Sequence, residues 1–132
     1  MDCTKKMLPG NILLVDDDPL IRKLGRELLE CLGYAVATAA DAPRALTAFQ
    51  RLPGVDLVIL DYHLPGPNGY ELLKELKGLD TGVRVLMITG FISKREAARL
   101  EASGIEGIIY KPFRLAELKR KIHAVLGKTP GC

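Results

Sequence analysis

The chain has 132 residues, of which 48% are hydrophobic, and it carries a formal net charge of +3. This length is typical of one domain, and the hydrophobic fraction excludes an intrinsically disordered chain, because enough apolar surface is available to offset the entropy cost of folding. No apolar run approaches the roughly 18 residues needed to cross a bilayer, and the first residues lack the apolar stretch of a signal peptide. We therefore expect a cytoplasmic protein with no membrane contact.

Lys and Arg outnumber Asp and Glu mainly beyond residue 84, where they are dispersed along helical segments without interleaved aromatic residues. This pattern is typical of solvated helix faces. A docking surface for an acidic partner is the second interpretation, and we expect no direct binding of nucleic acid by this domain. The cysteines, Cys3, Cys31 and Cys132, follow no metal-ligand spacing and favour a reducing compartment.

Short apolar runs alternate along the chain with segments of helical periodicity. Residues 12–15, 57–60 and 85–88 are too short for helices and are typical of strands buried on both faces, while residues 35–38 and 108–110 are weaker candidates. The segments between them have apolar residues at helical spacing. In chain order, these residues are Ile21, Leu24, Leu28 and Leu32, then Leu46 and Phe49, then Leu72, Leu73 and Leu76, and finally Leu115, Leu118, Ile122 and Val125.

Helix-capping residues support the same division. Asp18, followed by proline, predicts the start of the first helix, and Gly33 predicts its end. Asp41 and Ser93 are further N-cap candidates, and Glu96 completes a capping box with Ser93. The pattern predicts five β-α units over residues 11–126, forming an α/β fold with a parallel sheet and helices on both faces. Residues 1–10 and 127–132 are expected to be tails.

Polar side chains follow four of the predicted strands. Asp16 and Asp17 follow the first strand, Asp61 the third, Thr89 the fourth and Lys111 the fifth. In an open α/β sheet, ligands bind beyond the carboxyl ends of the strands, so we expect these groups to meet there. Three carboxylates brought together at the edge of an apolar core repel one another unless a cation neutralises them.

The types of these residues indicate phosphoryl-transfer chemistry. Carboxylate oxygens in a small open site suit Mg²⁺ or Mn²⁺, which also accept phosphate oxygens as ligands. Lys111 supplies a fixed positive charge and Thr89 a neutral donor, the groups wanted around a phosphoryl group in transfer. The sequence therefore predicts a site with an aspartate nucleophile.

Four segments resemble the signature segments of response-regulator receiver domains. They are ILLVDDDP at residues 12–19, DLVILDYHLPG at 56–66, MITG at 87–90 and YKPF at 110–113. The resemblance runs from about residue 11 to about residue 126, in the order and at the spacing of that family. It implies a flavodoxin-like five-stranded parallel sheet of order 2-1-3-4-5, with five helices. It also implies a phosphohistidine donor on a sensor histidine kinase or phosphotransfer protein.

The resemblance assigns a role to each metal ligand. Asp61 would be the phospho-acceptor and would also bind the Mg²⁺ or Mn²⁺ ion. Asp17 would bind the ion directly, Asp16 mostly through water, and His63 through its backbone carbonyl, so that its imidazole need not be a ligand.

The remaining roles concern the phosphoryl group and the output. Thr89 would bond one phosphoryl oxygen and Lys111 would pair with another, and the Lys111-Pro112 peptide bond would be cis. The domain would not turn over a separate substrate, but would catalyse its own phosphorylation and dephosphorylation. Because the sequence ends one helix after Lys111, we expect a downstream protein or output domain to receive the signal through a distal face.

Two positions depart from the usual receiver pattern. Receivers often carry Tyr or Phe three residues before the lysine, where the ring changes rotamer on activation, but this chain has Ile108 there and Tyr110 next to the lysine. We therefore expect a muted aromatic switch. Phe91, two residues after Thr89, occupies a place where many relatives carry smaller or polar side chains, and we expect it beside the path of the hydrolytic water.

Three other readings of the acidic residues remain open. A haloacid-dehalogenase-type phosphatase would use Asp16 as nucleophile in an Asp16-x-Asp18 motif, although Pro19 and Leu20 replace the residues usual beside it. A nucleotide-binding flavodoxin-like module would need glycines and amides where this chain has carboxylates. A degenerate receiver would bind partners without being phosphorylated.

Overall fold

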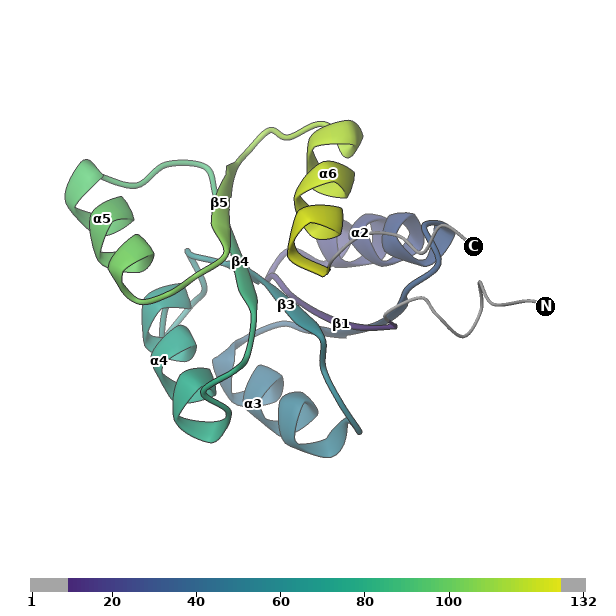
Figure 1. Cartoon of the computed structure of the whole chain (residues 1–132), viewed down its shortest axis with the longest axis horizontal. Coiled ribbons are helices and arrows are strands. Elements are labelled where there is room, and N and C mark those ends of the chain that lie inside the picture. The colour runs from purple at the N-terminus through teal and green to yellow at the C-terminus, as the bar shows by residue number, and fades with distance from the viewer. Residues whose placement is uncertain (1–9, 127–132) are drawn as a thin grey trace.

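The computed structural model describes residues 10–126. The expected tails lie outside this range, apart from Gly10. Strands and helices alternate along the chain (Figure 1), in the order β1 (Asn11–Val15), α2 (Pro19–Cys31), β2 (Ala35–Ala39), α3 (Ala42–Arg51), β3 (Leu57–Asp61), α4 (Gly69–Leu79), β4 (Val85–Thr89), α5 (Lys94–Ala102), β5 (Gly107–Tyr110) and α6 (Leu115–Leu126). Within residues 10–126, no helix is both long and apolar enough to span a membrane.

The five strands form one parallel sheet in the order β2-β1-β3-β4-β5, which confirms the expected flavodoxin-like topology. Strands β3 and β4 are buried along their whole length. A strand covered by helices on both faces has no polar side, which explains why these two segments read as continuous apolar runs.

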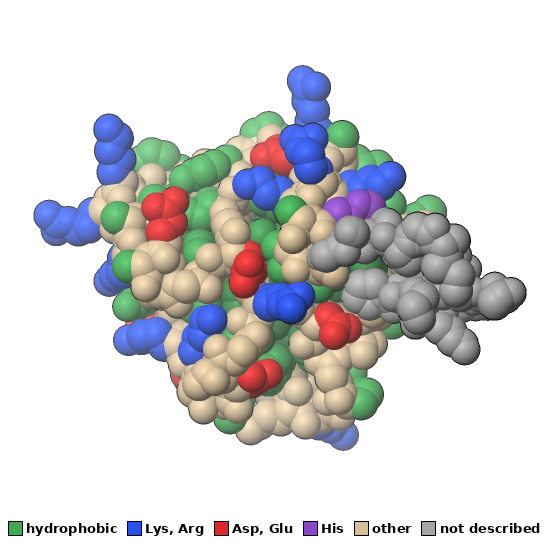
Figure 2. Space-filling view, in the orientation of Figure 1, with side chains coloured by type: hydrophobic (Ala, Val, Ile, Leu, Met, Phe, Trp, Pro, Cys, Tyr) green, Lys and Arg blue, Asp and Glu red, His purple; other side chains and the backbone are tan. Residues whose placement is uncertain are grey.

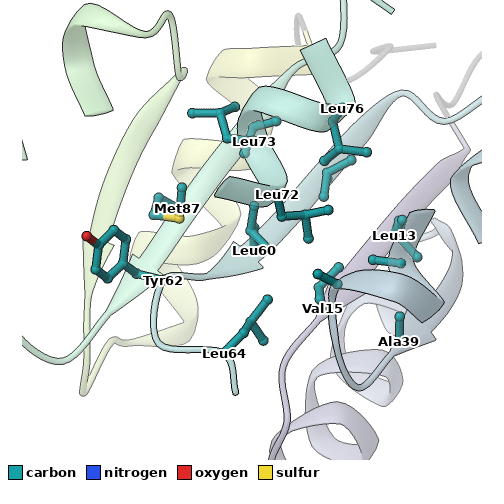
Figure 3. Packing of buried hydrophobic residues seen from close by; sticks show 14 of the residues in the cluster. Leu13, Val15, Ala39, Leu60, Tyr62, Leu64, Leu72, Leu73, Leu76 and Met87 are labelled. Atoms are coloured by element: carbon teal, nitrogen blue, oxygen red, sulfur yellow. The ribbon is translucent and has the colours of Figure 1, made fainter. Parts of the chain in front are cut away.

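The two faces of the sheet carry separate apolar clusters. Helices α3, α4 and α5 cover one face and helices α2 and α6 the other (Figure 1). Figure 3 shows the first cluster, in which side chains of the sheet meet those of α4. Its labelled members are Leu13, Val15, Ala39, Leu60, Tyr62, Leu64, Leu72, Leu73, Leu76 and Met87.

The apolar faces of α2 and α6 differ from the expected ones in two places. Leu24 is 52% exposed and Leu115 is 47% exposed, although both follow the helical spacing of their neighbours. The buried anchor of α2 is Leu29 instead. Spacing identifies a face of a helix, but the width of the stripe that reaches the core depends on how the helix is rotated against the sheet.

The helix ends agree with the predicted caps. Asp18, Asp41 and Ser93 are the N-caps of α2, α3 and α5, and each side chain accepts a hydrogen bond from a backbone amide of the first turn. Gly33, beyond the end of α2, has φ of 104°, a conformation that glycine adopts at little cost. Helix α4 has a capping box at Asn68 that the sequence analysis did not predict.

Helix α4 begins in close contact with the end of β3. The Gly69 amide donates to the Tyr62 carbonyl over 2.8 Å. A Cβ atom at Gly69 would lie 2.7 Å from the Cα of Tyr62, 2.9 Å from the carbonyl oxygen of Asp61 and 2.9 Å from the sulfur of Met87. Only glycine allows this approach, so the start of α4 fixes the backbone at the end of β3.

Gly69→Ala should lower the free energy of unfolding by about 1–3 kcal/mol, because the added methyl group overlaps backbone atoms that have no room to move. Gly78→Ala, on the same helix, is the matched control. A Cβ there meets nothing within 4 Å, and the variant should be stabilised by about 0.5–1 kcal/mol. Urea unfolding of both variants measures the difference. Equal midpoints for the two would contradict the close contact.

Candidate functional site

The carboxyl ends of β1, β3, β4 and β5 meet at one edge of the sheet, and the chemistry-bearing side chains gather there. Among the described residues, the buried polar or charged ones are Asp16, Asp61 and Thr89, with exposed fractions of 2%, 6% and 0%. Asp16 follows β1, Asp61 ends β3 and Thr89 ends β4. Buried charges need partners, so the surroundings of the two carboxylates determine what the site can do.

Three carboxylates and one ammonium group form the centre of the site. Carboxylate oxygens of Asp16, Asp17 and Asp61 all lie within 4.8 Å of one another. Lys111 Nζ lies 3.2 Å from Asp16 Oδ2 and 3.6 Å from Asp61 Oδ2. Asp17 is exposed, whereas the other two carboxylates are buried. The structure therefore brings together the acidic residues and the lysine that the sequence analysis selected.

Burial and charge act in opposite directions on the ionisable groups. Burial raises the pKa of Asp16 above its ordinary value, and the nearby Asp61 charge adds to this, while the Asp18 amide and Lys111 oppose it. Burial alone would lower the pKa of Lys111, but the charges of Asp61 and Asp16 outweigh it and raise that pKa. Lys111 thus stays protonated and balances part of the negative charge.

Backbone amides orient both buried carboxylates. The Asp18 amide donates to Asp16 Oδ1 over 2.9 Å, and the His63 amide donates to Asp61 Oδ1 over 3.0 Å. In each residue the other oxygen, Oδ2, is the one near Lys111. The Asp61 carboxylate is therefore held at one oxygen and presents the other towards the ammonium group.

The donor set fits a small divalent cation. Three carboxylates offering oxygens within 4.8 Å carry more negative charge than the one lysine beside them balances. The exposure of Asp17 leaves the cluster open to solvent on one side, and Mg²⁺ prefers such sites because it retains several waters.

The Thr89 hydroxyl is engaged with the loop that follows it. It accepts from the Phe91 amide over 3.2 Å and donates to the Phe91 carbonyl over 3.3 Å. The Lys111 amide donates to the Thr89 carbonyl over 2.8 Å. In this conformation the threonine stabilises the β4–α5 loop.

The His63 imidazole has a contact that the sequence did not indicate. Its Nε2 lies 2.8 Å from the Phe91 carbonyl oxygen, so the ring bridges the loops after β3 and β4. Phe91 itself is 76% exposed, and its ring points to solvent. The side chains of His63 and Thr89 therefore hold the backbone of Phe91, while the Phe91 side chain is solvated.

A second contact missed by the sequence analysis involves Tyr62, the residue directly after Asp61. The Tyr62 hydroxyl donates to Glu96 Oε2 over 3.0 Å. Ile108, where receivers often carry an aromatic ring, packs against the apolar cluster of the same face, and Tyr110 is 48% exposed. Glu96 was selected only as a capping residue, and its second role depends on a contact 34 residues away in sequence.

Charge on the surface is dispersed. Figure 2 shows Lys and Arg side chains spread over the visible face and interspersed with Asp and Glu. This agrees with the solvated helix faces expected from the sequence.

The family model of the response regulator receiver domain matches residues 12–123. The chain belongs to this family. Receivers act in the phosphorylation-based signalling of two-component systems. The match spans all four signature segments and includes every residue selected for the site.

Curated relatives and solved structures agree with this membership. The chain is 37% identical over 90% of its length to the sensor histidine kinase AruS of Pseudomonas aeruginosa, and spans 12% of that protein. It is 36% identical over 89% of its length to the DNA-binding response regulator MtrA of Mycolicibacterium smegmatis, and spans 51% of it. The chain thus covers about half or less of the length of these relatives.

Among solved structures, a CheY-like receiver from Methanospirillum hungatei superposes with a TM-score of 0.86 and 32% identity, over 91% of this chain and 95% of that one. The response regulator TrrA of Thermotoga maritima, solved in complex with Mg²⁺-BeF, gives a TM-score of 0.80 and 32% identity, over 89% of this chain and 100% of that one.

Lys111→Met should lower the free energy of unfolding at neutral pH by about 1–3 kcal/mol, because the buried Asp16 and Asp61 lose their counter-charge. The loss should shrink as the pH falls through the raised pKa of Asp16, since protonation removes the repulsion. Asp16→Asn in the same background should recover most of it. Lys119→Met, at an exposed position of α6, serves as control. Urea unfolding across pH tests this, and a loss that persisted with Asp16→Asn would contradict it.

Proposed function

We propose that Asp61 is the phospho-acceptor of this receiver, within a domain formed by residues 11–126. The donor would be a phosphohistidine on a sensor histidine kinase or phosphotransfer protein, and the transfer would take place in the cytoplasm. The main support is the position of Asp61 at the buried end of β3, with Oδ1 held by an amide and Oδ2 lying 3.6 Å from Lys111.

The chemistry follows from these contacts. An Asp61 carboxylate oxygen attacks the phosphorus atom, the bond from phosphorus to the histidine nitrogen breaks, and the electron pair leaves with the imidazole. The products are an acyl phosphate on Asp61 and a free histidine on the donor. Lys111 would pair with one phosphoryl oxygen and Thr89 would donate to another, which stabilises the charge on the transferring group.

A divalent cation completes the proposal. Asp16, Asp17, Asp61 and the backbone carbonyl of His63 would hold Mg²⁺ or Mn²⁺. When bound, the ion would neutralise negative charge on the transferring group. The clustering of three carboxylate oxygens within 4.8 Å supports this assignment. This chain's own groups provide the orientation: the backbone amides of Asp18 and His63 hold the carboxylates of Asp16 and Asp61, and Lys111 balances the charge at the other oxygen of Asp61.

Phosphorylation would change a distal face that binds a downstream protein or output domain, and the domain would catalyse its own phosphorylation and dephosphorylation. Curated relatives include both a sensor kinase and a DNA-binding regulator, which supports a role within a phosphorelay. The phosphatase alternative differs in one observable respect, because it would place the phosphoryl group on Asp16 instead of Asp61.

Incubation with acetyl phosphate and Mg²⁺ should add one phosphoryl group to the protein, measured by intact mass. Asp61→Asn should remain unlabelled, because an amide cannot form the acyl phosphate. Peptide mapping then separates the alternatives. Label on Asp16, or an Asp61→Asn variant labelled like the parent, would falsify the assignment.

Mg²⁺ affinity should fall at least about tenfold in Asp17→Asn. A hard cation is held here by few carboxylates, so the removal of one of them takes away much of the binding energy. Folding stability without metal should rise, because the change relieves repulsion among the three clustered carboxylates. Asp56→Asn is the matched control: this carboxylate binds the Asn11 amide at the opposite edge of the sheet. Isothermal titration calorimetry measures both, and equal affinities for the two variants would exclude Asp17 from the metal site.

A further inference from the structure

The residue directly after the acceptor contacts helix α5 through its side chain. Tyr62 is 3% exposed, and its ring lies beside Met87 in the apolar cluster (Figure 3). Only its hydroxyl group leaves this apolar environment, and it donates to Glu96 Oε2 over 3.0 Å. Burial and the bond to Glu96 raise the pKa of Tyr62, although the nearby Arg99 opposes this, so the hydroxyl that donates to Glu96 is protonated at neutral pH.

Glu96 joins this contact to the start of the helix. Its other oxygen, Oε1, accepts from the Ser93 amide over 3.0 Å, and Ser93 Oγ accepts from the Glu96 amide over 3.0 Å. One carboxylate therefore accepts hydrogen bonds from both the N-cap amide of α5 and the hydroxyl of Tyr62. Glu96 lies in the first turn of α5, so a displacement of this turn away from β3 carries Glu96 with it and breaks the bond to Tyr62.

Tyr62 itself is the fixed end of the contact. Its amide donates to the Ile88 carbonyl over 2.9 Å, and its carbonyl accepts from the Gly69 amide over 2.8 Å. The backbone of Tyr62 also packs so closely against Gly69 at the start of α4 that a Cβ atom there would not fit. We therefore expect the Tyr62 backbone to stay in place when α5 moves. Between the two partners, the α5 end is the one that can move.

Phosphorylation would act on that moving end through Thr89. A hydroxyl group has one proton, and here it is donated to the Phe91 carbonyl. Donation to a phosphoryl oxygen therefore requires the hydroxyl to leave that carbonyl, which loosens the loop leading to Ser93. Ile108 on β5 has no polar group that could exchange hydrogen-bond partners when the Thr89 hydroxyl moves.

We propose that Tyr62 is a positioning residue that restrains α5: its hydrogen bond to Glu96 stabilises the arrangement in which Thr89 is bound to the Phe91 backbone, and so opposes the arrangement that serves the phosphoryl group. This inference rests on the proposed phosphorylation of Asp61. A contact that stabilises one of two arrangements lowers the population of the other by its own free energy.

The direct test is Tyr62→Phe, which removes one oxygen atom and keeps the buried ring. The rate of labelling by acetyl phosphate should rise roughly two- to tenfold, the range expected for the loss of one hydrogen bond. Mg²⁺ affinity should match that of the parent. Amide chemical shifts of α5 should move towards their positions in the beryllofluoride complex before beryllofluoride is added. Tyr34→Phe is the control, since Tyr34 is also buried and its hydroxyl has no hydrogen-bond partner within residues 10–126.

A double-mutant cycle ties the effect to Glu96. Glu96→Ala should also accelerate labelling, and Tyr62→Phe should add nothing in that background. Ser93→Ala removes the other half of the capping box but keeps the Tyr62 contact, so it should not reproduce the acceleration. The proposed restraint is contradicted if the parent is labelled but Tyr62→Phe is labelled no faster. It is also contradicted if the effects of Tyr62→Phe and Glu96→Ala on the labelling rate are additive. If the parent itself takes up no label, the proposed function fails, and this inference fails with it.

Discussion

The site depends on one electrostatic interaction: the ammonium group of Lys111 balances part of the negative charge of Asp16 and Asp61, which follow or end other strands of the sheet. Neighbouring strands lie about 4.8 Å apart, so β1 and β5 are separated by roughly 14 Å, with β3 and β4 between them. Lys111 at the end of β5 reaches over β4 to Asp61 and Asp16. This is possible because β4 ends in Thr89, whose side chain is short and turned into its own loop. The contact thus combines a long cationic side chain directly after the edge strand β5 with a short side chain at the end of β4.

The same edge divides into fixed and movable parts. Asp61 belongs to a strand buried on both faces, and its flanking backbone is bonded to β4 and to the start of α4. The β4–α5 loop is held by individual side-chain hydrogen bonds, from Thr89 and from His63 to Phe91. Because a single hydrogen bond contributes little net free energy, the proposed phosphorylation of Asp61 would be accommodated by this loop before the strand moves.

The sequence predicted the fold and the charged centre because both have local signals. Apolar runs located β3 and β4, caps such as Asp18 located helix starts, and strand ends located the carboxylates and Lys111. The sheet order came from family resemblance, since periodicity contains no information on which strands pair. The contacts of Tyr62 and His63 were missed because they join residues 34 and 28 apart, and the direction of a side chain after a strand depends on packing. The exposure of Leu24 was missed for the same reason.

Ile108 stands where receivers often carry an aromatic ring, and this bears on how the proposed site would be coupled to a distal face. In register, Met87 lies opposite Ile108, and the ring of Tyr62 lies beside Met87 on the same face of the sheet. An aliphatic residue on β5 can repack but has no polar group to exchange between partners. Tyr62 has such a group, and it is covalently adjacent to Asp61, whereas β5 lies two strands away from β3. Allosteric couplings are usually about 1–3 kcal/mol, a size that one or two hydrogen bonds can supply. The proposed polar link from β3 to α5, through Tyr62 and Glu96, would therefore take the place of a ring on β5.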